Sequence, residues 1–588
     1  MTDTCRNTGT TAYKSVTVQN PQQSATNYNQ LWLTEQGTST NGEIGYTRVT
    51  RYTYTAPGQW DMQQGPDTNT VLRDELHTDL WDATYTYRTN TDLIRDGASN
   101  VVAQTVEYHT LFPWGGELPT LRIVGTGSAS LTNQWLYYTN AATDGTNYSH
   151  LKQIIEPTGR WETYQYGPNG CATQIVSQLM NSAVGSPNSS TRVVCVIYSI
   201  NAPQVTTITY LLGSEVARSY QLSGPGWVEN IQCQNPGAAY TDANNLVTQT
   251  FYTGGNGTNP VQQITYPDGT IAAYSYSTNF TLLQETTTVS IGLPDGTGTN
   301  VADGTTTLTT VDPFGNPVST VVTDVLSGLT ISSNAYSNPD LQGRPQTITY
   351  LDNSIATTIY EFCCGTGVST NRDGVSTTNT YDALGRMLTT TSLGITNLYY
   401  YDAAGRTVAT VRQGTDGSTV TNGAGFDTAG RQISTTNALG GVITNAYSYL
   451  ANGQNVRTIT NPDGGTDIQV FYLDGTVATN MGTAVPSSAY VYGIVADNGT
   501  NRACQTEIKL NTSYAATAET VTNLLDMIGR GYKTVYPDGS SAWSAYNDLG
   551  QLIQSVDPDG VTTLYLYNGK GEQVDKATDL NGSVLRVV

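Results

Sequence analysis

Residues 381–386 read Tyr-Asp-Ala-Leu-Gly-Arg, and residues 401–406 repeat this phrase 20 positions later as Tyr-Asp-Ala-Ala-Gly-Arg. Between the copies, Gly394 separates two β-prone runs, 387–392 and 395–400. Asp side chains bond backbone N–H groups ahead of them, and Gly supplies the positive φ that closes a tight bend. Each unit is therefore predicted to be a strand, a turn, a strand and another turn, and a period of this length is typical of stacked repeats.

Looser copies of this unit cover most of the chain. They read Pro-Asp-Gly or a close variant, then a Thr-rich alternating run, then Tyr-x-Tyr; examples begin at Glu156, Tyr266, Tyr536 and Asp557. The phrase resembles the YD repeat of the RHS/teneurin family. Members of this family wind a continuous antiparallel sheet into a spiral, which closes into a hollow shell in the toxin-associated and teneurin members. The resemblance implies the same architecture here.

The wider sequence also predicts an all-β fold. Residues 261–266 and 561–567 alternate with period two, turn signals recur roughly every ten residues, and no long 3.6-residue pattern is seen. A sheet of this length must curl, because strand twist accumulates. The expected fold is a YD-repeat spiral of antiparallel strands forming a curved, hollow shell or barrel.

Two regions are distinguished by composition. Residues 1–235 are irregular and hold seven of the eight Trp and all three His, which suggests a cap or ligand site. Residues 236–588 are regular repeats, with an atypical segment near 481–520 that would be an insertion or one short helix.

The charge balance excludes several partners. The chain has 26 Lys and Arg against 47 Asp and Glu, a net charge of −21, and no basic patch for nucleic acid or for an anionic membrane surface. No run of about 18 apolar residues is present, so no membrane insertion is expected. The start of the chain does not resemble a signal peptide, yet the composition is that of an extracellular protein. We expect a secreted or cell-surface bacterial protein.

The three histidines are candidate catalytic residues. His77, His109 and His150 are 32 and 41 residues apart, so a spiral could bring them together. With Tyr108 and Arg122 they could abstract and donate a proton beside a neutralised carboxylate, the chemistry of a polysaccharide lyase. Paired carboxylates such as Glu107 and Glu156 would suit a glycosidase instead. None of the histidines has a recognisable nucleophile nearby.

Aromatic residues of the same region are candidate carbohydrate platforms, because Trp and Tyr rings stack on sugars; these are Trp81, Trp114, Trp135 and Tyr148. The alternative interpretation is that the aromatics fill a capping plug and the histidines are ordinary half-buried residues. No cofactor and no metal site are predicted, although the acidic turns would allow a surface Ca²⁺. The turn at Asp557 lacks the ligand spacing of a calcium loop.

Three functions remain open. The first is a structural or adhesive protein whose rigid β shell binds carbohydrate, a cell-surface glycan or neighbouring cells. The second is a carbohydrate-active enzyme using the His-bearing third. The third is a shell fragment of a toxin-encapsulating RHS protein. Many toxin-bearing members self-cleave near an Asp-Pro-x-Gly signature, but Asp312-Pro313-Phe314-Gly315 lies mid-chain in an ordinary repeat. We therefore expect neither self-cleavage nor a resident toxin.

Overall fold

The computed structural model describes residues 2–6, 12–19, 30–38, 44–199, 204–253, 260–340, 343–361, 365–580 and 583–587. These residues form one sheet of 46 strands, and each strand pairs antiparallel with the next along the chain. Three complete 3-10 turns lie within the described ranges, Gly127–Ala129, Gly145–Asn147 and Asn188–Ser190. The all-β prediction is confirmed.

The first strands are β1 Thr2–Arg6, β2 Ala12–Gln19, β3 Gln30–Thr38, β4 Ile44–Ala56, β5 Gln59–Gly65, β6 Arg73–Trp81, β7 Tyr87–Arg95, β8 Val101–Leu111, β9 Glu117–Val124, β10 Leu131–Tyr137, β11 Leu151–Ile155, β12 Trp161–Tyr166, β13 Ala172–Ser177, β14 Arg192–Tyr198, β15 Gln204–Leu211, β16 Ser214–Gly224, β17 Trp227–Gln232, β18 Leu246–Tyr252, β19 Val261–Thr265, β20 Ile271–Asn279, β21 Gln284–Pro294, β22 Val301–Val311 and β23 Pro317–Asp324.

The remaining strands are β24 Thr330–Pro339, β25 Pro345–Tyr350, β26 Ile355–Glu361, β27 Gly365–Thr370, β28 Ser376–Tyr381, β29 Met387–Ser392, β30 Ile395–Tyr401, β31 Thr407–Gln413, β32 Thr419–Phe426, β33 Gln432–Thr436, β34 Val442–Tyr449, β35 Asn455–Thr460, β36 Thr466–Phe471, β37 Val477–Met481, β38 Ser488–Asp497, β39 Thr500–Leu510, β40 Ala516–Leu525, β41 Gly531–Val535, β42 Ser541–Tyr546, β43 Leu552–Val556, β44 Thr562–Tyr567, β45 Gln573–Leu580 and β46 Ser583–Val587.

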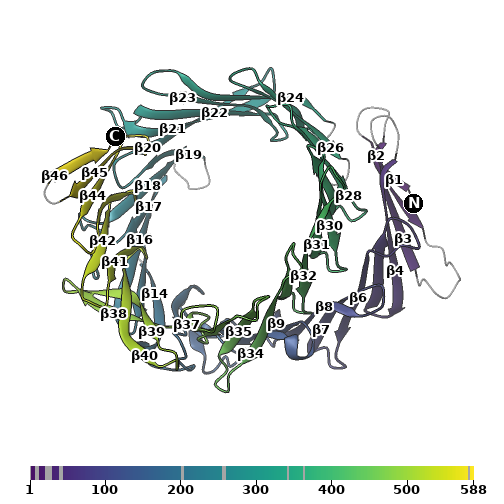
Figure 1. The fold of residues 1–588 in the computed structure, drawn as a ribbon, viewed down its shortest axis with the longest axis horizontal. Helices are drawn as coiled ribbons and strands as arrows, with labels where there is room; N and C mark the ends of the chain where they lie inside the picture. The colour runs from purple at the N-terminus through teal and green to yellow at the C-terminus, as the bar shows by residue number, and fades with distance from the viewer. Residues whose placement is uncertain are drawn as a thin grey trace.

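The sheet is wound into a ring that makes more than one revolution (Figure 1). From the N-terminal strands at the right, it passes along the bottom at β7–β9, up the left at β14–β18, across the top at β20–β23 and down the right at β26–β32. It then returns along the bottom and left as β34–β46, and none of the described strands crosses the middle of the ring. The predicted curved spiral is thus observed as an open ring.

The Asp side chain caps the turn of each repeat as the sequence predicts, and the Arg side chain of the same turn adds a further contact to it. Asp382 accepts the backbone N–H groups of Leu384 and Arg386, both at 2.9 Å, and the Arg386 Nε donates to its second oxygen at 2.7 Å. The Arg386 guanidinium then lies over the ring of Tyr401, 4.8 Å from its centroid. The Tyr401 hydroxyl donates to the carbonyl of Met387 at 2.8 Å. One repeat is therefore clipped to the next by a cation–π contact and a hydrogen bond.

The same clip recurs along the sheet. In each copy an Arg lies over a Tyr whose hydroxyl bonds the carbonyl of the residue after that Arg. The further copies are Arg344 with Tyr360, Arg431 with Tyr447 and Arg530 with Tyr546. In one unit Phe426 replaces the Tyr and keeps the stack, with the Arg406 guanidinium at 4.8 Å.

Strand register divides the side chains between two faces. Tyr276, Tyr360, Tyr381, Tyr401 and Tyr447 lie on one face, here called the tyrosine face. The opposite, threonine face carries Thr288, Thr306, Thr378 and Thr389 among others. Because successive side chains of a strand point to opposite sides, this assignment holds along each ladder.

The two faces differ in charge. From β20 to β37 the charged strand residues on the tyrosine face are Glu285, Asp303, Asp324, Arg412, Arg457 and Asp467. Between β20 and β37 the threonine face carries one charged strand residue among those described, Glu361, at the end of β26. Both faces expose apolar side chains, with Ile359 and Leu566 (each 59% exposed) on the threonine face and Ile291 (46%) and Leu293 (42%) on the tyrosine face.

The core of this single sheet is thin. The described buried side chains form small local clusters, such as Tyr220, Ile231, Cys233 and Ala238 beside β16 and β17. A second cluster joins Val456, Val470 and Ala478. Stability must therefore come largely from the ladder and from side-chain pairs across strands.

Successive revolutions are bonded along a seam, defined here by contacts between residues nearly 300 positions apart. Thr126 and Thr428, 302 residues apart, share a hydrogen bond of 3.0 Å. Asp474 accepts the N–H of Met180, 294 residues away, at 2.5 Å and donates its own N–H to the Met180 carbonyl at 3.1 Å. Asn501 donates to Ser214, 287 residues away. One revolution thus takes nearly 300 residues at these points.

The two regions distinguished by composition are continuous in the sheet. β17 and β18 pair across residues 235–236. The short helix considered for residues 481–520 is wrong, because this segment lies within the ladder β37–β40. Its strands β38 and β39 have 10 and 11 residues, against 5 or 6 in β35–β37. This longer hairpin is what breaks the sequence period.

Candidate functional site

Three of the five candidate catalytic residues share the tyrosine face. His77 lies on β6, His109 on β8 and Arg122 on β9, and the register places all three on the same side. Tyr108 lies within β8 on the opposite face and is 36% exposed. It therefore points away from the histidine next to it in the chain.

A network of charged groups joins His109 to Arg122. Arg88 donates to Asp79 at 2.7 and 2.6 Å and to Glu117 at 2.9 Å. The His109 ring lies 3.6 Å from Glu117 through Nδ1 and 3.7 Å from Glu107 through Nε2. The last link joins Glu107 to the Arg122 Nε, at 3.2 Å. The network crosses β6, β7, β8 and β9.

The electrostatics of this network favour structural pairing. The Arg88 hydrogen bond holds the pKa of Asp79 below its ordinary value, and the charges of His77 and His109 act in the same direction. His77 contacts Asp92 through Nδ1 and stacks on Trp60 with 4.7 Å between ring centroids. Most of these carboxylates are therefore matched to cations across strands. The His109 Nε2 is buried without a hydrogen bond.

His150 lies apart from the other two histidines. It precedes β11, three strands beyond β8 in the ladder, so roughly 14 Å separates the strands. Its Nδ1 lies 2.9 Å from the Tyr148 carbonyl, and its ring packs on Tyr166 at 4.5 Å. The structure thus brings His77, His109 and Arg122 to one face and leaves His150 and Tyr108 outside this group.

The candidate carbohydrate platforms are only partly together. Trp114 stacks on Phe112 at 4.5 Å, and Tyr148 meets it edge-on at 5.4 Å. Trp81 instead lies near Tyr85, with the Arg88 guanidinium 5.9 Å from its ring. Trp135 is on the tyrosine face of β10.

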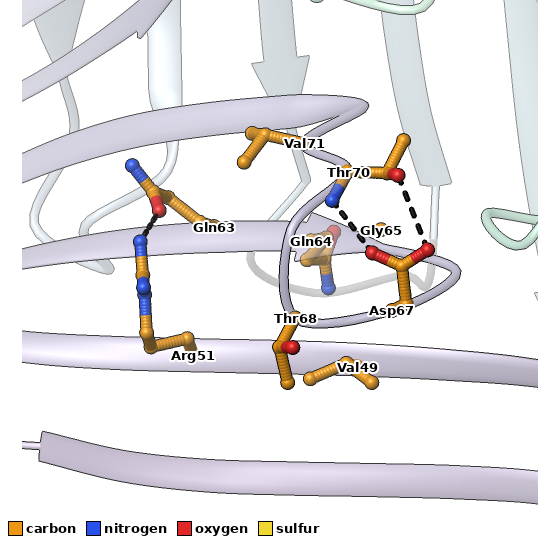
Figure 2. A pocket seen from close by; sticks show the side chains of 9 residues that line it. All are labelled: Val49, Arg51, Gln63, Gln64, Gly65, Asp67, Thr68, Thr70 and Val71. Atoms are coloured by element: carbon orange, nitrogen blue, oxygen red, sulfur yellow. Dashed lines mark hydrogen bonds between the residues drawn. The ribbon is translucent and has the colours of Figure 1, made fainter.

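A small pocket lies between β4, β5 and the loop that follows β5 (Figure 2). Asp67 closes this loop by accepting the Thr70 N–H at 2.7 Å and its hydroxyl at 3.2 Å. Arg51 donates to Gln63 on the neighbouring strand. The pocket volume is about 10 Å³, roughly the space of one water molecule. It is too small for an organic ligand.

A much larger cavity, of about 630 Å³, lies on the seam and was not predicted from the sequence. Side chains of β13–β17 form one side, and side chains of β38–β40 and of the turn after β40 form the other. The lining includes Gln178, Leu179, Arg192, Leu211, Leu525 and Met527. No local pattern could have indicated it, because its two sides lie about 300 residues apart in the chain.

In the described residues, no three or more His, Cys, Asp or Glu side chains gather where they could hold a metal ion. The Asp557 turn is capped by bonds to the N–H groups of Asp559 and Val561. Asp312 likewise caps an ordinary turn between β22 and β23.

The described ranges contain no helix that is long and apolar enough to span a membrane.

Comparison with known proteins identifies the repeat. The model of the family RHS Repeat matches residues 546–584, so the resemblance read from the sequence is confirmed in this stretch. No curated protein is similar to the chain in sequence.

Three solved structures align over nearly the whole chain. They are TcdB2-TccC3 (11% identity, 97% of this chain and 42% of that one, TM-score 0.32), the Photorhabdus luminescens Tc holotoxin pore (10%, 98% and 44%, 0.32) and TcdB2-TccC3 without its hypervariable C-terminal region (10%, 98% and 45%, 0.34). The chain spans less than half the length of these solved chains.

Proposed function

We propose that this RHS-repeat chain is the wall of a shell that surrounds a second polypeptide. The observation that carries the proposal is the single sheet itself, wound through more than one revolution with neighbouring revolutions bonded along the seam. A globular binding protein needs a packed core, whereas a wall needs continuous closure along its length. The clips between repeats and the seam bonds supply such closure.

The difference between the two faces supports the same proposal. A shell wall has one face toward bulk solvent and one toward its contents. From β20 to β37 nearly all charged strand residues are on the tyrosine face, so the threonine face is almost uncharged, and its exposed side chains include Leu308 and Ile359. Exposed apolar surface of this kind is typical of contact with another polypeptide.

Neighbouring residues of β22 test this function. Leu308→Cys places a thiol on the threonine face and Thr307→Cys places one on the tyrosine face. Both thiols should react similarly with N-ethylmaleimide, which is small. The thiol on the face that points into the shell should react several-fold more slowly with a polymer-linked maleimide, because the shell keeps the polymer out of its interior. Mass spectrometry of the labelled peptides separates these thiols from the native cysteines. Equal rates with the polymer reagent at both positions would rule out an enclosing wall.

We further propose that the shell works outside the bacterial cell or at its surface. The acidic, Tyr- and Thr-rich composition supports this location. Antibody labelling of intact cells, compared with lysed cells, tests it. Labelling confined to lysed cells would contradict it.

Glycan binding is a second candidate function, and the shared face of His109 and Arg122 is the observation that favours it. A polysaccharide panel tests it. Rising ultraviolet absorbance would reveal lyase action, and new reducing ends would reveal hydrolysis. If a polysaccharide is cleaved and His109→Ala abolishes the cleavage, carbohydrate cleavage becomes the leading function in place of the shell wall. If the chain neither cleaves nor binds any polysaccharide, glycan binding is ruled out.

A further inference from the structure

The seam cavity has the size of a small-molecule site. Its volume of about 630 Å³ falls within the usual range for such sites, about 300–1,000 Å³. The register places Ser177, Arg192 and Leu211 side by side on the tyrosine face, where they border the first-revolution side of the cavity. The second revolution borders its other side.

Part of the lining is apolar. Leu179 is 8% exposed and Met527 is 2% exposed, and they come from opposite sides of the seam. Leu211 and Leu525 add to this surface. An apolar side chain of a ligand would therefore be removed from water here, at a gain of about 25 cal/mol for each Å² covered.

Gln178 lines the cavity, and its side chain has a buried hydrogen-bond acceptor without a partner. The residue is 5% exposed, and its Oε1 has no hydrogen-bond partner. The orientation of the amide is fixed, because its Nε2 donates to the Ser182 carbonyl at 2.8 Å and that carbonyl can only accept. A buried acceptor without a partner is costly, so the site calls for an N–H or O–H donor.

Arg192 supplies an uncommitted positive charge. It is exposed, and in the described part of the chain its guanidinium has no ion pair or hydrogen bond. By contrast, Arg160 is paired with Glu162 at 2.8 Å. The guanidinium fork of Arg192 is therefore available for a carboxylate.

The two acidic residues of the lining are already engaged. Asp474 accepts the N–H groups of Met180 and Thr476. Asp526 accepts the N–H of Ile528 and the backbone and Nε of Arg530. These bonds compensate both carboxylates, which leaves Arg192 as the group that selects the charge of a ligand.

We propose that the seam cavity binds a carboxylate that carries a neighbouring amide N–H and an apolar side chain. The carboxylate pairs with Arg192, the N–H donates to Gln178 Oε1, and the apolar group lies against Leu179, Leu525 and Met527. This chemistry belongs both to free N-acyl apolar amino acids and to a polypeptide that ends in an apolar residue. The proposal goes beyond the shell wall and does not depend on it.

Calorimetric titration of the full chain with two probes tests the proposal and its source. The probes are N-acetyl-leucine and an acetylated peptide ending in Leu-Leu with a free carboxylate. N-acetyl-leucinamide, which lacks the charge, and 4-methylpentanoate, which lacks the N–H, should each bind at least several-fold more weakly than N-acetyl-leucine. Binding of both probes supports a site for the free molecule, and binding of the peptide alone supports a polypeptide terminus. Binding of neither overturns the proposal.

Two variants and a matched control complete the test. Arg192→Gln removes an exposed charge and should weaken binding about tenfold or more. Gln178→Leu should remove the preference for the N–H-bearing probe over 4-methylpentanoate. Arg412→Gln, which changes an exposed arginine of the same face on β31, should leave binding unchanged. Equal affinities in Arg192→Gln and in the parent chain would refute the assignment even if a probe binds, and the folded state of Arg192→Gln is checked by its unfolding midpoint.

Discussion

Arg386 shows at the scale of one residue how the repeat is built. Its Nε is bonded to Asp382 at 2.7 Å, its Nη1 donates to the Asp402 carbonyl at 3.2 Å, and its flat face covers the Tyr401 ring. Lys has no planar fork and could not make these contacts together. The arginine therefore connects its own turn to the next one along the sheet.

Tyr401→Phe isolates the hydrogen bond of this clip. The ring and its cation–π contact remain, while the bond to the Met387 carbonyl is lost. The free energy of unfolding should fall by about 1 kcal/mol, measured in urea. Tyr400→Phe is the matched control, because Tyr400 is 50% exposed on the threonine face, and it should change stability by less than about 0.5 kcal/mol. Equal effects of the two substitutions would show that the hydroxyl contributes nothing.

Strands β6–β9 show how charged side chains of neighbouring strands are paired with one another. A chain of ion pairs crosses them on the tyrosine face, with Arg88 between Asp79 and Glu117. These groups are about 30% exposed, so water weakens each pair, and their combined arrangement matters more than any single one. Cross-strand pairs of this kind fix register in a sheet that has little core.

Arg88→Met tests this matching. With the arginine gone, the pKa of Asp79 should rise toward its ordinary value, because the Arg88 hydrogen bond is the main cause of its depression. Carboxyl titration followed by NMR measures the change. Since the folded pKa is depressed, the pair stabilises the protein above pH 4 or so and loses this effect in acid. The variant should therefore show a weaker fall in stability below about pH 4, and an unchanged acid profile would count against the pairing.

The whole molecule depends on the seam between revolutions. Gly125 and Gly405 both have φ near +90°, at +87° and +86°. A Cβ on Gly405 would meet nothing within 4 Å, whereas a Cβ on Gly125 would come 2.7 Å from the Ala429 Cβ of the next revolution. The spacing of the revolutions is thus set partly by the absence of a side chain.

Gly405→Ala and Gly125→Ala form a matched pair for the seam. Both place alanine in a left-handed conformation, at a cost of about 1–2 kcal/mol. Gly125→Ala should cost about 1–3 kcal/mol more, because the revolutions must separate to admit the methyl group. Urea unfolding gives the difference, and hydrogen exchange should rise at the seam in this variant alone. Similar stabilities for the two variants would show that the contact is not tight.

Acid should weaken another contact between revolutions, which joins residues 246 positions apart. Asp324, at the end of β23, forms an ion pair with Lys570 at 2.5 Å, which together with Ser327 lowers its pKa to about 2. A depressed carboxyl pKa gives stability above the ordinary pKa of 3.8, and this is lost as the pH falls toward 2. Hydrogen-exchange protection near residue 324, taken relative to the intrinsic rate at each pH, should therefore fall between about pH 4 and pH 2.

Lys570→Met should remove most of this pH dependence, because Asp324 then lacks its cation. Lys576→Met, on β45 near Tyr565, should leave it intact and serves as the control. An identical acid response in the two variants would exclude Lys570 as the cause.

The sequence by itself determined the repeat. Asp382, Gly385 and Arg386 act through bonds within about 20 residues, so their spacing is visible in the chain, as is the alternation that gives an all-β fold. The position of Tyr in each unit was also predicted, though not its stack under the preceding Arg. These features could be read because every contact is local.

Only the tertiary structure decided which distant residues meet. Neighbouring strands are rotated slightly relative to one another, and these rotations accumulate over nearly 300 residues before one revolution of the sheet meets the next. No local sequence pattern contains the accumulated rotation. For this reason the sequence could not show that His77 and His109 share a face while His150 lies apart. It also could not place Gln178 and Met527 in the lining of one cavity, because that cavity exists only where two revolutions lie side by side.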